Sequence, residues 1–183
     1  MTSEILEIIL YKFDFIIGLF IGLLGTLYSW HQRQLELKSR LYYPLFIACH
    51  NLLLIFDEIE TIKNDEKQGR ELYFTAAKHF DDIMNSYGTI TNLKSKSKDP
   101  EKNYLNIFFK VKRIIDLNQN SIQNNWSRAK IWFENGKKKT YSGDDPEIHK
   151  KIDEFNNFYN QLLKLKELCE DKDRTLRDYK DYE

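Results

Sequence analysis

The chain has 183 residues, and its 28 basic and 28 acidic side chains give a formal net charge of zero at pH 7. This balance gives no strong electrostatic pointer to nucleic acid, and we expect no DNA partner. Three prolines and seven glycines leave little turn material for a sheet. We therefore predict an all-α fold.

The first predicted element is an apolar helix near the start of the chain. Residues 15–30, FIIGLFIGLLGTLYSW, carry no charge, and residues 5–13 before them are mostly apolar. A helix over residues 5–30 would be about 39 Å long, enough for a hydrocarbon core of roughly 30 Å. A cleaved signal peptide and a buried core helix are the alternatives, but Glu4 and Glu7 replace the basic residues of a signal peptide. We predict a retained transmembrane anchor in residues 1–30 and a separate helical domain in residues 31–183.

Basic residues follow the apolar stretch and predict its orientation. Arg33, Lys38 and Arg40 come directly after it, whereas the preceding side has two acids and Lys12. The positive-inside rule then places the helical domain in the cytoplasm and the N-terminus outside the bacterial inner membrane. We expect the three basic residues to contact lipid headgroups.

The predicted anchor has one polar, small-residue face. Placed at about 100° per residue, Glu7, Asp14, Gly18, Gly22 and Gly25 fall within a sector of roughly 80°. Glycines spaced by four allow close helix packing, and intramembrane carboxylates face a partner, a lumen or the headgroups. The face indicates either a glycine-packed dimer or a lumen lining in an oligomer of about five or more chains. Self-association is expected in both cases.

The next predicted helix, over residues 31–63, continues from the anchor and is interrupted at Pro44. Its apolar part, residues 41–56, contains His50 and Asn51, which is more typical of a core helix than of a second span. A second span or a re-entrant segment is the alternative.

A further helix is predicted over residues 70–93, with residues 94–98 as a solvated basic loop. Its apolar stripe consists of Leu72, Tyr73, Ala76, Phe80, Ile83, Met84 and Tyr87.

Asp99 and Pro100 then give the start signal of a third helix, with a heptad seam that reaches Trp132. Asn118 and Asn125 lie in this seam, where they fix the register or line a polar pocket or subunit contact.

Asn135 and Gly136 predict the end of that helix, and Asp145 and Pro146 the start of the last one. The last helix carries Ile148, Ile152, Phe155, Tyr159, Leu162 and Cys169 at heptad spacing. The helical domain is therefore predicted to be a bundle of about four helices.

A Gly-rich phosphate loop, a His-Glu-x-x-His motif and a cysteine pair at zinc spacing are missing from the sequence, so we expect no cofactor, no metal and no enzymatic activity. His79, Asp81 and Asp82 come closest to a ligand set, but an exposed helix face explains them.

An aromatic and basic cluster is the best candidate for contact with a partner protein or single-stranded RNA. It consists of Trp126, Arg128, Lys130 and Trp132. Packing of the two tryptophans in the core is the alternative.

The helical layout invites comparison with the HEPN superfamily, whose ribonucleases pair an arginine and a histidine about four to six residues apart. The nearest pairs here, Arg40 with His50 and Arg70 with His79, are spaced too widely. No catalytic residue is carried over, and the bundle resembles a degenerate HEPN domain.

A short chain with an N-terminal anchor, such a bundle and many Lys, Asn and Ile residues resembles the small membrane accessory proteins of type VI-B CRISPR antiphage systems. That resemblance implies a homo-oligomeric membrane pore that perturbs the envelope on infection, with a CRISPR effector ribonuclease or RNA as a candidate partner. The alternatives are a membrane-tethered adaptor that docks a protein or RNA, and a tethered HEPN-type ribonuclease.

Overall fold

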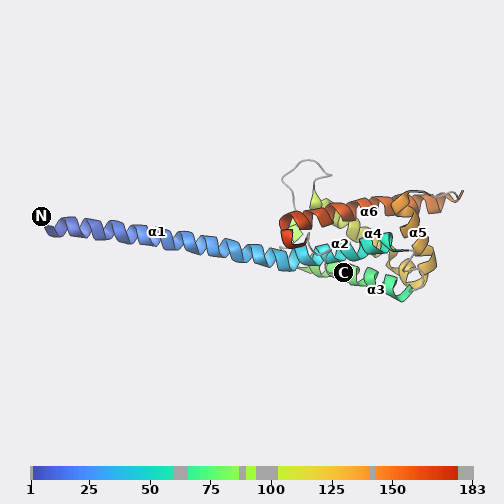
Figure 1. Cartoon of the computed structure of the whole chain (residues 1–183), viewed down its shortest axis with the longest axis horizontal. Helices are drawn as coiled ribbons and strands as arrows, with labels where there is room; N and C mark the ends of the chain where they lie inside the picture. Colours follow the sequence, from blue (N-terminus) through green and yellow to red (C-terminus); the bar gives the residue numbers. More distant parts are fainter. Residues whose placement is uncertain (1, 60–65, 87–89, 94–102, 141–142, 177–183) are drawn as a thin grey trace. The chain divides into compact units, whose positions relative to one another are not determined.

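The computed structural model describes residues 2–59, 66–86, 90–93, 103–140 and 143–176, and of residues 2–12 and 14 the backbone alone (Figure 1). Every regular element in these ranges is helical, which confirms the all-α prediction. The chain divides into two compact units, Met1–Leu37 and Lys38–Glu183.

The first unit is a single helix, α1 (Thr2–Leu37), of 36 residues. It is longer than the predicted residues 5–30 because the segment after Trp30 contains no glycine or proline and is rich in good helix formers.

The helix continues without a loop through a π-helical turn, η1 (Lys38–Tyr42), into α2 (Tyr43–Asp57). Pro44 lies in the first turn of α2. Because proline has no N–H and its ring crowds the carbonyl of the residue four positions earlier, the regular α-helical ladder is interrupted at Arg40. The wider π-helical turn lies at this point, in agreement with the interruption predicted at Pro44.

Helix α2 is a core helix of the second unit. Leu45, Ala48, Cys49, Leu52 and Ile55 are completely buried. This confirms the core-helix interpretation of residues 41–56 over a second span.

Helix α3 (Glu66–Asn85) is followed by a short 3₁₀ turn, η3 (Ile90–Leu93). The predicted helix over residues 70–93 therefore begins and ends too late. Tyr73, Ala76, Phe80 and Ile83 are buried as expected, whereas Met84, the last described residue of the predicted stripe, is 45% exposed. Tyr87 lies outside the described residues.

The long third helix predicted from the heptad seam is two helices, α4 (Tyr104–Asn124) and α5 (Trp126–Lys138). The predicted start at Asp99 and Pro100 lies outside the described residues, and Asn103 caps α4 instead. At Asn125 the chain leaves the helical conformation, and the side chain accepts a hydrogen bond from the backbone N–H of Arg128 at 3.1 Å. Asn125 is therefore an N-cap and not a seam residue, because asparagine competes for backbone groups.

Gly136 lies inside α5 and is buried, so the predicted stop at this residue is wrong. A Cβ at this position would lie 2.7 Å from Cβ of Phe155, and the Gly136 carbonyl accepts a hydrogen bond from the Asn156 side chain at 2.8 Å. The glycine allows close approach of α5 to α6, and α5 ends two residues later, before Lys139 in the left-handed region.

Helix α6 (Pro146–Lys172) begins as predicted. Asp145 accepts hydrogen bonds from the N–H groups of Glu147 and Ile148 at 2.9 and 3.4 Å. The described residues of the second unit therefore form five α-helices, α2 to α6, where the sequence predicts about four, because the heptad seam is broken at Asn125.

Aromatic rings join α2, α5 and α6 at the centre of this unit. Phe133 lies 4.8 Å from Phe56 and 5.0 Å from Phe155 between ring centroids, both edge to face. Trp132 packs on Phe155 at 5.6 Å. These contacts fix α5 against α6 and position the side chains that open onto the surface beside them.

Candidate functional site

The apolar stretch of α1 is exposed along its length. Its large side chains are 43–65% exposed and include Phe15, Ile16, Ile17, Leu19, Phe20, Ile21, Leu23, Leu24, Leu27 and Tyr28. In the described part of the chain, one helix, the continuous Phe15–Asp57, is long and apolar enough to cross a membrane, and its most apolar window has no buried residue. A core helix of similar composition would be mostly buried. By length and composition, this segment is able to span a bilayer.

Three glycines, Gly18, Gly22 and Gly25, lie on the predicted small-residue face of α1. A Cβ added at Gly18, Gly22 or Gly25 would have no heavy atom within 4 Å beyond the local helix. The helix runs through positions 7 and 14 without a break, but the side chains of Glu7 and Asp14 lie outside the described residues.

The basic residues after the apolar stretch differ in their surroundings. Arg33 and Arg40 are exposed, whereas the Lys38 ammonium contacts the Asp173 carboxylate at 3.2 Å. Burial acts to raise the pKa of Asp173, but hydrogen bonds from Thr175 and Lys38 outweigh burial and lower the pKa. The Lys38 side chain is still 40% exposed, so its lipid contact stays a prediction.

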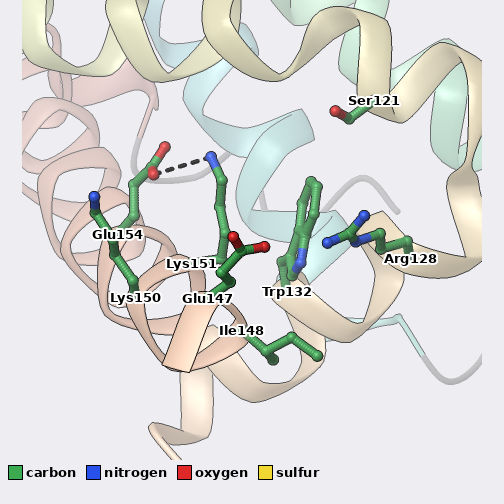
Figure 2. A pocket seen from close by; sticks show the side chains of 8 residues that line it. All are labelled: Ser121, Arg128, Trp132, Glu147, Ile148, Lys150, Lys151 and Glu154. Atoms are coloured by element: carbon green, nitrogen blue, oxygen red, sulfur yellow. Dashed lines mark hydrogen bonds and ion pairs between the residues drawn. The ribbon is translucent and has the colours of Figure 1, made fainter. Parts of the chain in front are cut away.

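A pocket lies where α4, α5 and α6 meet, with a volume of about 410 Å³ (Figure 2). Its lining consists of Ser121, Arg128, Trp132, Glu147, Ile148, Lys150, Lys151 and Glu154. This volume lies within the range of about 300–1,000 Å³ that is usual for small-molecule sites.

Two of the lining residues, Lys151 and Glu154, belong to a network of polar side chains that includes Asn118. Asn118 is 1% exposed, and its amide donates to Glu154 at 3.2 Å while its carbonyl accepts from Lys151 at 3.0 Å. Lys151 also pairs with Glu154 at 3.0 Å, and the Asn118 amide donates to the Ile114 carbonyl at 2.8 Å. Buried polar groups need such complete pairing, so Asn118 joins α4 to α6 through a polar contact.

Two cations lie over the Trp132 indole. The Arg128 guanidinium carbon is 5.9 Å from the ring centroid, and the Lys151 ammonium is 5.5 Å from it. Figure 2 shows the indole between the two groups. Both are within the usual range of cation–π attraction.

The structure brings together part of the predicted sites. Arg128 and Trp132 line the pocket, whereas Asn125, Trp126 and Lys130 are not among its lining residues. Asn118 does not line the pocket but contacts two lining residues, Lys151 and Glu154. Trp126 and Trp132 are 3% and 4% exposed, which confirms the core-packing interpretation of the tryptophans. Between them, Arg128 is exposed and Lys130 is half-buried.

Sequence reasoning missed the contribution of α6 to the pocket. Glu147, Lys150, Lys151 and Glu154 recur at spacings of three and four, which places them on one face of the helix. This charged face, beside the basic residues of the preceding helix, is the signal that could have indicated a polar pocket.

His79, Asp81 and Asp82, the nearest to a ligand set in the sequence, all lie in α3. Within the described ranges, no group of three His, Cys, Asp or Glu residues could hold an ion. Asp81 contacts Lys112 at 2.9 Å instead, and Arg70 pairs with Glu66.

Comparison of the chain with protein-family models, with curated proteins and with solved structures gave no match.

Proposed function

We propose that the chain is a membrane-anchored protein whose α1 helices assemble into a homo-oligomeric pore that perturbs the bacterial envelope in antiviral defence. The observation that carries the proposal is the exposed, apolar α1, whose Gly18, Gly22 and Gly25 have open space around an added Cβ. The antiviral setting, the CRISPR effector or RNA partner and the degenerate HEPN relationship are supported by the resemblance in layout alone.

Exposed apolar side chains support insertion of α1 into lipid. Burying one large apolar side chain is worth about 1.5–3 kcal/mol relative to leaving it in water, and α1 exposes many of them. The basic flank, with Arg33, Lys38 and Arg40, supports an orientation with the bundle in the cytoplasm.

The glycine face supports assembly of α1 with copies of itself. Lipid chains offer no hydrophobic driving force between helices, so helices associate in membranes through close backbone packing at small residues. Glu7 and Asp14 share this side of the helical period, so a ring of about five or more helices would carry carboxylates toward its centre. Rings of carboxylates favour the passage of cations over anions.

We propose that the chain has no enzymatic activity.

Self-association is tested by light scattering of the detergent-extracted protein, corrected for bound detergent. We expect a discrete assembly of about five or more chains. Gly22→Leu should reduce its mass because a large side chain separates the helices, whereas Phe20→Leu, on the opposite side of α1, should leave the mass unchanged. A monomeric or dimeric wild type would contradict the pore.

Conduction is tested by ion flux through lipid vesicles that contain the protein. Asp14→Leu should abolish conductance while the protein stays in the membrane. Unaltered conductance in this variant would contradict the proposed lining.

A membrane-tethered adaptor is the second candidate, and the exposed Arg128 beside the pocket favours it. Replacement of α1 by an unrelated spanning helix should preserve the activity of an adaptor and destroy that of a pore.

A further inference from the structure

We infer that the pocket between α4, α5 and α6 binds a nucleoside monophosphate. The inference goes beyond the proposed pore and does not depend on it, because the pocket residues all belong to the second unit. It rests on the charge that remains after the side chains of the pocket have paired with one another.

Two of the five charged lining residues neutralise each other. Lys151 and Glu154 form an ion pair that also contacts Asn118, so their opposite charges cancel. In the described part of the chain, the side chains of Arg128 and Lys150 have no carboxylate partner. The unpaired lining charge is therefore two cations against Glu147, which favours an anionic ligand.

The guanidinium of Arg128 is the best anion contact. The indole of Trp132 holds it by a face contact at 5.9 Å, which leaves its N–H groups available for oxygen atoms. Figure 2 shows Ser121 and Arg128 on the same side of Trp132. A planar guanidinium and a hydroxyl group that line the same pocket suit the several acceptor oxygens of a phosphate.

The rest of the lining suits a ligand that is larger than a phosphate ion. Ile148 offers apolar surface, and the Glu147 carboxylate accepts hydrogen bonds from ligand hydroxyl or amino groups. A nucleotide carries a phosphate, ribose hydroxyls and a flat base, and a 410 Å³ pocket is of the size that small-molecule ligands use. The N-terminus of α6 adds nothing, because Asp145 already accepts from its N–H groups.

The test is isothermal titration calorimetry of the full chain in non-ionic detergent with AMP, GMP, CMP and UMP as probes. We expect saturable binding of at least one of them. Adenosine, which lacks the phosphate, and ribose 5-phosphate, which lacks the base, should each bind at least tenfold more weakly than the nucleotide.

Arg128→Ala should weaken the binding at least tenfold, and Ser121→Ala should weaken it several-fold. Arg128 is exposed and Ser121 is half-buried, so we expect both variants to fold. A thermal melt checks that each variant is folded. Arg113→Ala, at an exposed arginine of α4 outside the pocket, is the matched control and should bind as the wild type does.

Inorganic phosphate and oligoadenylate RNA are titrated as further probes. The inference would be overturned by the absence of saturable heat with all four nucleotides or by unchanged affinity in Arg128→Ala. It would also be overturned by equal affinity for inorganic phosphate or ribose 5-phosphate, or by binding of the oligoadenylate RNA alone. Conductance plays no part in this assay, so its failure is distinguishable from failure of the proposed pore.

Discussion

Gly136→Ala is expected to destabilise the bundle although alanine is the better helix former. The new Cβ would lie 2.7 Å from Cβ of Phe155 and 3.2 Å from its carbonyl carbon. Carbon atoms are at their optimal separation at about 3.5–4.0 Å, so α5 must move away from α6 by roughly 1 Å. Neither obstacle is the end of a flexible side chain, so rotamer changes cannot relieve the contact.

Two opposing terms determine how much Gly136→Ala changes the free energy of unfolding. Overpacking costs about 1–3 kcal/mol, and replacing glycine by alanine inside a helix gains about 1 kcal/mol. The expected net loss is about 1 kcal/mol, which lowers Tm by roughly 2–4 °C in a domain of this size. A larger side chain, as in Gly136→Val, should lower Tm further.

The assay is a thermal melt of the full chain in detergent, followed by tryptophan fluorescence, because Trp126 and Trp132 lie in the core. Ser127→Ala, at an exposed position of α5, is the control and should change stability by less than about 0.5 kcal/mol. A Gly136→Ala protein as stable as the wild type, or more stable, would refute the close approach of α5 to α6.

Two further predictions concern a cap and an ion pair. Asn125→Ala removes the acceptor for the Arg128 N–H and should cost about 1 kcal/mol in urea unfolding, whereas the exposed neighbour Asn124→Ala should cost less; equal losses would contradict the capping role. The folded-state pKa of Asp173 is lowered below its ordinary 3.8, so its carboxylate contributes stability above that pH and loses it as the pH falls through the lowered pKa. The difference in Tm between wild type and Asp173→Asn should therefore be constant between about pH 5 and 7 and shrink at lower pH. A difference that does not shrink on acidification would contradict the pairing with Lys38.

Local signals in the sequence determined the helical class and the helix starts that depend on one or two residues. The Asp145–Pro146 start is correct because an aspartate cap and a proline at the first helical position act without help from the rest of the fold. The uncharged run after Asp14 likewise determines that α1 is long and apolar whatever the bundle does.

Tertiary packing decided the features that depend on contacts between distant residues. Gly136 has the sequence signature of a helix end, and only the proximity of Phe155 shows that it is a contact glycine within α5. Asn118 and Asn125 occupy equivalent heptad positions, yet one is buried against Lys151 and the other caps a helix, because the partner that satisfies each amide lies on a different segment. The charged face of α6 could have indicated a polar pocket, but only packing assembles it: Arg128 and Lys151 are 23 positions apart, and their shared contact with Trp132 exists only once α5 and α6 have packed.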